Sequence, residues 1–540
     1  GRQPMISPDG RLVLALNGEI YNYGDLHREL GSPEGGWRGH SDTEVALAAF
    51  SRWGVEEALR RFNGMFALAL WDRRERTLFL ARDRMGEKPL YYGWQGGTFL
   101  FGSELKALRA YPGWEGEIDR GALALLLRHG YLPAPYSIYR GVRKLSAATF
   151  LKLPAGAGPG LAGREETHAF WSLAEAWERG RNNRCQGPVE ETEAELAALL
   201  QDAVTLRMRS DVPLGAFLSG GIDSSAVVAL MQKAGEAGTA GPVRTFTIGF
   251  HEGFYDEAPF AREVARHLGT DHTERYVTPE EALAVIPQLP EIYDEPFADS
   301  SQIPTLLLSR LARKHVTVAL SGDGGDELFG GYDRYRSAQA LWKRIGWLPF
   351  PLRKAASRAI QAIPARHLDR CLGWTSRLLG RYGRVDSVGE KAHRAGDILA
   401  FAGREELYLR VMSHFKRPLD LVIGAEGPDG RELATPYNDF SPACRDRDYL
   451  DVMSFRDQAC YLPDDILVKV DRASMACGLE VRVPFLDHRV VEFSWRLPPE
   501  LKISGLNQKV ILRRILEKRG MTTPLRDEKK GLTIQFNQWL

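Results

Sequence analysis

The feature that most constrains this chain is the run Ser-Gly-Gly-Ile-Asp-Ser-Ser at 219–225, which separates an apolar segment from an apolar helical segment. Residues 212–218 before it are predicted to form a buried strand, and 224–234 after it a helix. A strand that ends in small residues and turns directly into a helix points several backbone N–H groups, and the positive end of the helix dipole, at one spot. The run therefore predicts a site for nucleotide phosphates, with Asp223 placed to hold a metal ion on them.

A plain helix cap is the competing interpretation of a short Ser-Gly-Gly sequence. The run lacks the lysine of the common phosphate-binding loop and the glycine spacing of dinucleotide folds. The whole of 219–225, however, resembles the pyrophosphate loop of ATP pyrophosphatases, which cleave ATP between its α and β phosphates and adenylylate a substrate.

Composition limits the class of protein. A chain of 540 residues is long enough for two or more domains, and 44% hydrophobic with 26% charged residues is typical of a globular enzyme. The balance of 71 basic and 70 acidic residues argues against a nucleic-acid partner, and no apolar run is long enough to predict a membrane partner. Five cysteines without metal-binding spacing favour a reducing cytoplasm.

The pattern of apolar runs, turns and helices differs between the two halves of the chain. This difference predicts two domains, the first of α+β class and the second of α/β class. Short apolar runs separated by turns, with helices expected only at 43–52 and 55–62, predict stacked sheets in residues 1–155. A Gly-, Pro- and charge-rich stretch predicts a linker at 156–189. Residues 190–540 alternate strands and helices, which predicts a doubly wound parallel sheet. Its strands are expected at 212–218, 243–250 and 315–320, and its helices at 224–234, 255–268 and 303–314.

Three of the expected strand ends carry suitable chemistry, and in such sheets ligands bind at the carboxyl ends of the strands. The first is the loop at Ser219. The second includes Ile248, which is suited to rest against an adenine ring, and the third is the run 321–327, rich in glycine and carboxylates. Asp223 and Asp326 then form a natural pair for Mg²⁺ on a departing pyrophosphate.

Motifs along the whole chain resemble the glutamine-hydrolysing asparagine synthetase family. In the second half the matching motifs lie at 219–225, 321–332, 471–476 and 480–487; in the first half they lie at 17–22, 41–44, 82–86, 88–92 and 103–104. The resemblance implies a four-layer αββα amidotransferase domain of the N-terminal-nucleophile type, followed by an ATP pyrophosphatase domain with helical additions. It implies ATP-dependent conversion of aspartate to asparagine through β-aspartyl-AMP, with ATP and Mg²⁺ as cofactors.

The resemblance also assigns roles in the synthetase half. The residues implied for ATP are Leu218, Ser219, Gly221, Asp223, Ser224, Ile248, Ser321 and Gly322. Asp223 and Asp326 are implied for the metal, and Asp323 and Lys509 for catalysis. By itself a lysine at 509 is typical of a solvated helix surface. Asp323 stands where some family members have glutamate. Because its side chain is shorter, a substrate other than aspartate stays an alternative as the carboxylate that is amidated.

In the first half, the resemblance implies that Asn17 and Gly18 form an oxyanion hole for glutamine hydrolysis and that Glu19 and Asp42 bind the glutamine amino group. Without it, Asn17-Gly18 predicts a tight hairpin turn, and Asp42 a helix N-cap. The family's nucleophile is an N-terminal cysteine, whereas this sequence begins with Gly1 and looks cut at both ends. We therefore expect the chain as given to use ammonia and not to hydrolyse glutamine.

Several alternatives stay open at this point. They are a related ligase acting on another carboxylate (β-lactam-forming, or glycan- or peptide-amidating), another adenylating enzyme of the same fold, and a catalytically silent regulatory homologue. The expected partners are the small substrates aspartate, glutamine or ammonia, and ATP, with a homodimer left open. The basic, Trp-bearing segment 335–393 is interpreted as amphipathic helices with solvated arginines.

Overall fold

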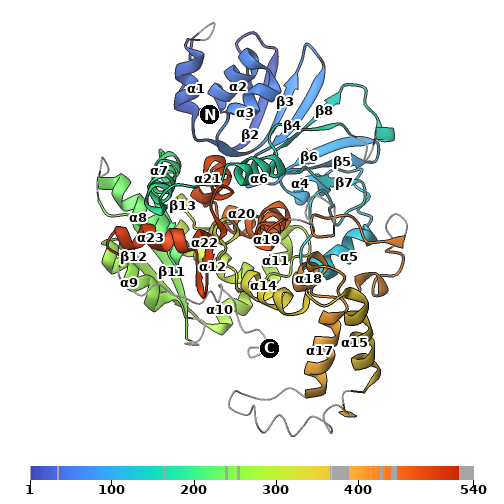
Figure 1. Ribbon diagram of the computed structural model, residues 1–540. Coiled ribbons are helices and arrows are strands. Elements are labelled where there is room, and N and C mark those ends of the chain that lie inside the picture. Colours follow the sequence, from blue (N-terminus) through green and yellow to red (C-terminus); the bar gives the residue numbers. More distant parts are fainter. Residues whose placement is uncertain are drawn as a thin grey trace.

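A computed structural model describes residues 2–521 except 33–35, 162–164, 237–240, 252–255, 365, 368–387, 426–429 and 439–446. Part of the basic segment, Cys371 and Cys444 therefore lie outside the described residues. The chain forms two parts, with the first (blue to teal) packed against the second (green to red) (Figure 1). No helix in the described ranges is long and apolar enough to cross a membrane.

Two antiparallel sheets form the first part. The larger has the order β1-β2-β3-β4-β8-β9 and the smaller the order β6-β5-β7. Their strands are β1 (Met5–Ile6), β2 (Leu12–Ile20), β3 (Gly64–Asp72), β4 (Thr77–Arg82), β5 (Tyr91–Gln95), β6 (Thr98–Gly102), β7 (Val142–Lys144), β8 (Thr149–Pro154) and β9 (Thr167–Ala169).

Helices cover both outer faces of this pair of sheets. Helices α1 (Tyr23–Leu30), α2 (Asp42–Trp53) and α3 (Val55–Arg61) bury an apolar cluster against β2 and β3. A second cluster, with Leu80, Tyr92 and Leu151, fills the space between the sheets. On the far side α4 (Leu105–Arg109) packs on β5 and β7, and α5 (Arg120–His129) follows. The expected αββα layering is confirmed.

The second part is built on a parallel sheet of order β12-β11-β10-β13-β14. Its strands are β10 (Leu214–Phe217), β11 (Arg244–Phe250), β12 (Asp271–Val277), β13 (Val318–Leu320) and β14 (Glu480–Arg482). Every neighbouring pair is parallel. Sequence analysis missed β12, which is mostly polar, and β14, which has only three residues.

Helices pack on both faces of this sheet, as expected for a doubly wound fold. One face carries α7 (Val189–Arg207), α8 (Ile222–Glu236), α9 (Ala258–Leu268) and α23 (Val510–Lys518). The other carries α12 (Gln302–Arg313) and α20 (Leu467–Met475). Two helices of the basic segment, α14 (Asp333–Ile345) and α15 (Phe350–Ala362), are followed by α17 (Val388–Leu399) and α18 (Arg404–Val411), and α15 and α17 project as a pair (Figure 1).

Between the two parts, the segment predicted as a linker contains β9 and a helix, α6 (Leu173–Asn182). Trp177 of α6 packs against Trp495, which belongs to the second part. Across the boundary Lys88 Nζ forms a buried ion pair of 2.9 Å with Asp471. Such buried, directional contacts fix the relative position of the two parts.

Candidate active site

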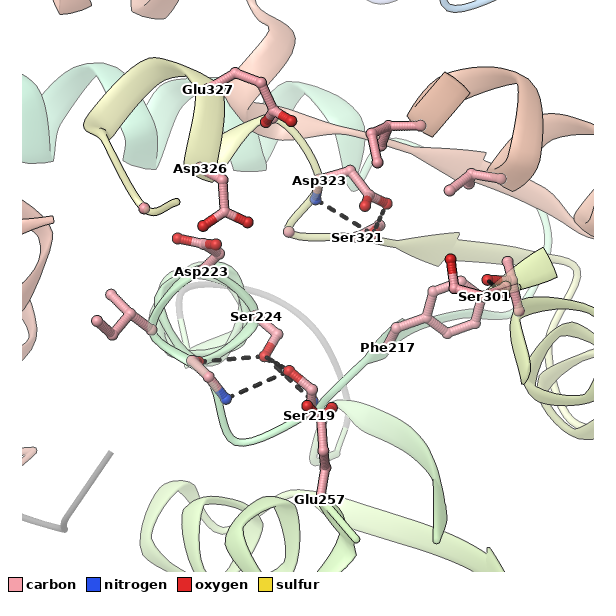
Figure 2. Close-up of a pocket in the computed structure, with 18 of the residues that line it drawn as sticks. Phe217, Ser219, Asp223, Ser224, Glu257, Ser301, Ser321, Asp323, Asp326 and Glu327 are labelled. Atoms are coloured by element: carbon pink, nitrogen blue, oxygen red, sulfur yellow. Dashed lines mark hydrogen bonds between the residues drawn. The ribbon is translucent and has the colours of Figure 1, made fainter. Parts of the chain in front are cut away.

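A cavity of about 460 Å³ lies at the carboxyl ends of β10, β11 and β13. All the residues predicted for the synthetase half line it, namely Leu218, Ser219, Gly221, Asp223, Ser224, Ile248, Ser321, Gly322, Asp323, Asp326 and Lys509. Figure 2 shows the two loops on opposite walls, with Ser219 and Ser224 on one side and Ser321 to Glu327 on the other. Their convergence follows from the sheet order, because β10 and β13 are direct neighbours.

The loop after β10 is held open by its own serines. The Ser219 amide N–H donates to Ser224 Oγ at 3.2 Å, and the Gly221 N–H donates to Ser219 Oγ at 3.3 Å. Gly220 has φ of +74°, and a Cβ there would lie 2.6 Å from the carbonyl carbon of Phe260. Only glycine fits this turn, which leads directly into α8 and leaves hydroxyls and amides facing the cavity.

The loop after β13 and the short helix that follows it present three carboxyl groups to the cavity, those of Asp323, Asp326 and Glu327. Ser321 Oγ donates to Asp323 Oδ2 at 2.5 Å. Glu327, in α13 (Gly325–Phe329), is buried and accepts a hydrogen bond of 2.5 Å from the Tyr332 hydroxyl. Burial raises the pKa of Glu327 to about 7. Sequence analysis did not assign Glu327, although it ends the predicted run.

A three-member charge centre joins the two loops. Lys509 Nζ forms ion pairs with Asp223 Oδ2 and, at 2.6 Å, with Asp326 Oδ1. Lys509 is only 6% exposed and has φ of 52° at the N-cap of α23, so it is not the solvated helix-surface lysine that its local sequence alone suggests. A Cβ on Gly331 would lie 1.9 Å from Asp326 Oδ1 and 2.1 Å from Lys509 Cε. The centre exists because glycine occupies that position.

The two aspartates also fit a magnesium ion. Asp223 Oδ1 is buried and has no hydrogen-bond partner among the described residues. In the described ranges no cluster of three or more His, Cys, Asp or Glu side chains is arranged for a metal. Mg²⁺ in phosphate sites commonly takes one or two carboxylates and completes its shell with phosphate oxygens and water, so a carboxylate pair is sufficient.

A second ion pair in the cavity was not predicted. Lys469 Nζ lies 2.8 Å from Asp299 Oδ2 and 2.8 Å from Ser301 Oγ. Burial opposes ionisation of Asp299, but Lys469 outweighs it and the pKa of Asp299 falls to about 2. The available signal was a lysine between the apolar residues Leu467, Val468 and Val470 at the start of α20, where an unpaired buried charge is costly.

Asn17 and Gly18 lie within β2, opposite Ala67 and Phe66 of β3. They do not form a hairpin turn. Gly18 has φ of +140°, and a Cβ there would meet Met65 O at 2.0 Å, so the position demands glycine because the backbones approach closely. Asn17 Nδ2 donates to Ser103 Oγ at 3.1 Å.

Glu19 and Asp42 are close enough to influence each other. Burial, and then the charge of Asp42, raise the pKa of Glu19 to about 7, against the opposing effect of Arg482. Arg482 of β14 approaches Glu19 Oε2 at 3.6 Å. Asp42 Oδ2 accepts from the Ile20 N–H at 2.9 Å. The N-cap of α2 is Ser41 and not Asp42, which is the first helical residue.

Comparison with known proteins gives two family matches. A model described as asparagine synthase matches residues 195–540, and one described as glutamine amidotransferase domain matches residues 1–162. A putative asparagine synthetase [glutamine-hydrolyzing] of Mycobacterium tuberculosis is 35% identical over 99% of this chain and 77% of its own length. Asparagine synthetase [glutamine-hydrolyzing] 1 of Bacillus subtilis is 32% identical over 100% and 78%. Amidase chry2 of Gibberella zeae is 27% identical over 93% and 73%.

Proposed function

The chain belongs to the asparagine synthase family, and from this membership we propose that it is an AMP-forming carbon–nitrogen ligase that converts aspartate to asparagine with ATP. The observation that carries the proposal is the cavity in which the loops 219–225 and 321–327 meet around Lys509, Asp223 and Asp326.

Each wall of the cavity suits one portion of the nucleotide. Leu218 and Ile248 are buried apolar side chains that would contact the adenine, beside the Ser321-Gly322 backbone. The Ser219 and Ser224 hydroxyls line the cavity beside the start of α8 and would turn to donate to phosphate oxygens, which would also release the Gly221 N–H from Ser219 Oγ for the same purpose. These contacts would fix the α-phosphorus in front of an incoming carboxylate.

Charge neutralisation is the other contribution that the site would make. Asp223 and Asp326 would hold Mg²⁺, which supplies positive charge to the departing pyrophosphate. Lys509, released from part of its pairing with these carboxylates, would donate to the same phosphate oxygens. Asp323, held by Ser321, would accept a proton from the attacking ammonia.

In the first part, Asn17 Nδ2 and the Gly18 N–H are proposed as oxyanion donors, and Glu19 and Asp42 as ligands of the glutamine amino group. The match of residues 1–162 to the glutamine amidotransferase domain supports this assignment. A cytoplasmic location stays a prediction, as does a homodimer.

One assay tests the activity directly. The chain is incubated with Mg-ATP, L-aspartate and ammonium, and AMP, pyrophosphate and asparagine are measured. We expect all three in equal amounts, and none from Asp223→Asn. Absence of AMP in the presence of aspartate, ammonium and Mg-ATP would refute the proposal. A separate incubation with glutamine in place of ammonium tests whether the first part supplies ammonia to the second, and we expect no asparagine from it.

A second candidate is amidation of another carboxylate. It is favoured by Asp323, which is shorter than the glutamate of some family members. If another carboxylate supports AMP release and aspartate does not, the adenylation chemistry stands and the acceptor changes.

A further inference from the structure

A second cavity of about 330 Å³ adjoins the first. Asp299 and Tyr461 line both, so the two cavities meet at these side chains. Both parts of the molecule contribute to its wall, because His129 ends α5 of the first part, whereas Arg334 and Asp465 belong to the second. None of these three residues has a role in the function proposed above.

His129 is 4% exposed, and neither of its ring nitrogens makes a well-aligned hydrogen bond among the described residues, although the Met412 backbone lies near enough to act on its pKa. Its ring packs beside Tyr131 and Tyr437, with centroids 5.6 and 5.4 Å away. Burial lowers the pKa of His129 to about 3, so the neutral ring offers one N–H donor and one acceptor. A buried polar group without a partner is costly, and a ligand in the cavity would relieve that cost.

Arg334 supplies positive charge to the same wall. Its Nη2 donates to Asp457 Oδ2 at 2.7 Å, and its Nε donates to the Tyr408 hydroxyl at 3.2 Å. The guanidinium carbon also lies 4.8 Å from the ring centroid of Tyr461. These contacts hold the group rigidly and use two of its three nitrogens, which suits it to receive a carboxylate together with His129.

Two carboxyl groups lie on the side that faces the first cavity, those of Asp299 and Asp465. Asp299 is kept ionised by Lys469. Asp465 is 6% exposed, and its Oδ1 has no hydrogen-bond partner among the described residues. Burial and the neighbouring Asp299 raise the pKa of Asp465 well above its ordinary value. Together the pair offers acceptor oxygens suited to an ammonium group.

We propose that the second cavity binds the α-amino and α-carboxylate groups of a free amino acid whose side-chain carboxylate extends past Asp299 and Tyr461 into the first cavity. Arg334 and His129 bind the α-carboxylate, and Asp299 with Asp465 binds the α-ammonium. The inference rests on the proposed function, because it takes the first cavity as the place where a carboxylate is activated.

Substrate analogues test this arrangement on the unaltered chain. Succinate lacks the ammonium group of aspartate, and L-aspartic acid α-amide lacks the α-carboxylate charge. We expect each to support AMP release with kcat/KM at least about 100-fold below that of L-aspartate, because each leaves buried polar groups unpaired. Use of either analogue as readily as aspartate would overturn the inference.

A variant then assigns the carboxylate end. His129→Leu is expected to raise the KM for aspartate about tenfold with little change in kcat. It should also reduce the ratio of kcat/KM for aspartate to kcat/KM for the α-amide, because His129 binds the α-carboxylate. The corresponding ratio of aspartate to succinate should not change. His129→Asn retains a donor and should restore most of the affinity. His272→Asn, at a half-buried histidine on β12 outside both cavities, is the control for a general loss of stability.

The two hypotheses fail in different ways. An unchanged KM for aspartate in both His129 variants overturns the second cavity's role and leaves the ligase activity intact. If His129→Leu does not fold, the asparagine variant and the analogue series decide. If the chain forms no AMP from aspartate, the ligase proposal falls, and calorimetric titration with the three acids decides the inference: preferential binding of aspartate supports it, and equal or absent binding overturns it.

Discussion

Two glutamates with a pKa near 7, Glu327 and Glu19, mark the two predicted sites and show how differently these are built. Glu327 is 1% exposed and held by Tyr332, within a cavity whose loops come from neighbouring strands of one sheet. Glu19 keeps 27% of its side chain exposed and faces Arg482, which belongs to the other part. The predicted ATP site is thus built within the second part alone, whereas the predicted glutamine site depends on a contact between the two parts.

The strongest test of the self-contained site is Gly331→Ala. A Cβ at this position would overlap Asp326 Oδ1 and Lys509 Cε, so the charge centre must separate. We expect AMP release to fall by at least about 1000-fold.

The matched control is Gly160→Ala, since a Cβ on Gly160 meets nothing within 4 Å. Activity in Gly331→Ala within tenfold of the parent would mean that the charge centre is not needed as the structure has it.

Lys509→Ala should cost nearly as much. Its removal leaves Asp223 and Asp326 facing each other without a cation and removes a phosphate donor, so a loss of about 100- to 1000-fold in kcat is expected. Lys518→Ala, on the exposed end of the same helix, should stay close to the parent. Steady-state rates of AMP formation distinguish the two, and equal rates would contradict the assignment.

The Glu327→Gln variant tests the buried carboxyl of the ATP cavity. Because its pKa in the folded chain lies above that of the unfolded chain, ionisation costs stability; the cost is absent below about pH 4.5 and complete above about pH 7. Glutamine removes the cost, so the thermal midpoint of the variant should exceed that of the parent at about pH 8, by the equivalent of about 2 kcal/mol, and match it at about pH 5. A constant difference between the two pH values would count against titration of Glu327.

Glu19→Gln is the corresponding substitution in the first part. It should also stabilise the chain at high pH, but by less than Glu327→Gln does. Its pKa is also raised, so stability is again lost as pH rises toward about 7, but exposure and the pairing with Arg482 reduce the effect to about 1 kcal/mol or less. Thermal midpoints of the two variants across the same pH range make the comparison. An effect at Glu19 larger than at Glu327 would reverse the contrast between the sites.

The sequence was sufficient for the features that local patterns determine. The loop 219–225, the run 321–327 and the strands β10, β11 and β13 could be predicted because each motif follows its own apolar strand, and parallel strands place their carboxyl ends on one edge. The layers of the second part followed from the alternation of strands and helices, whereas the apolar runs of the first part predicted stacked sheets and only the family resemblance implied the αββα order.

What could not be predicted depends on contacts distant in the chain. Lys469 pairs with Asp299, which lies 170 positions earlier in the sequence. Strand β14 has only three residues, too few for a recognisable strand pattern. Asn17-Gly18 has the composition of a turn, yet its pairing with β3 keeps it extended, because tertiary contacts outweigh local turn preference. Ser41 caps α2 in place of Asp42, since the Asp42 carboxylate is engaged by the Ile20 amide.

The position of His129 at the end of α5 has a consequence for protein engineering. A chimera that joined the second part to an amidotransferase domain from another enzyme would carry a different residue into the second cavity, even with every residue of the ATP cavity unchanged. Exchanging the nitrogen-supplying module would then alter acceptor selectivity as well. Under the proposed arrangement, both parts of the molecule together determine which acceptor is used.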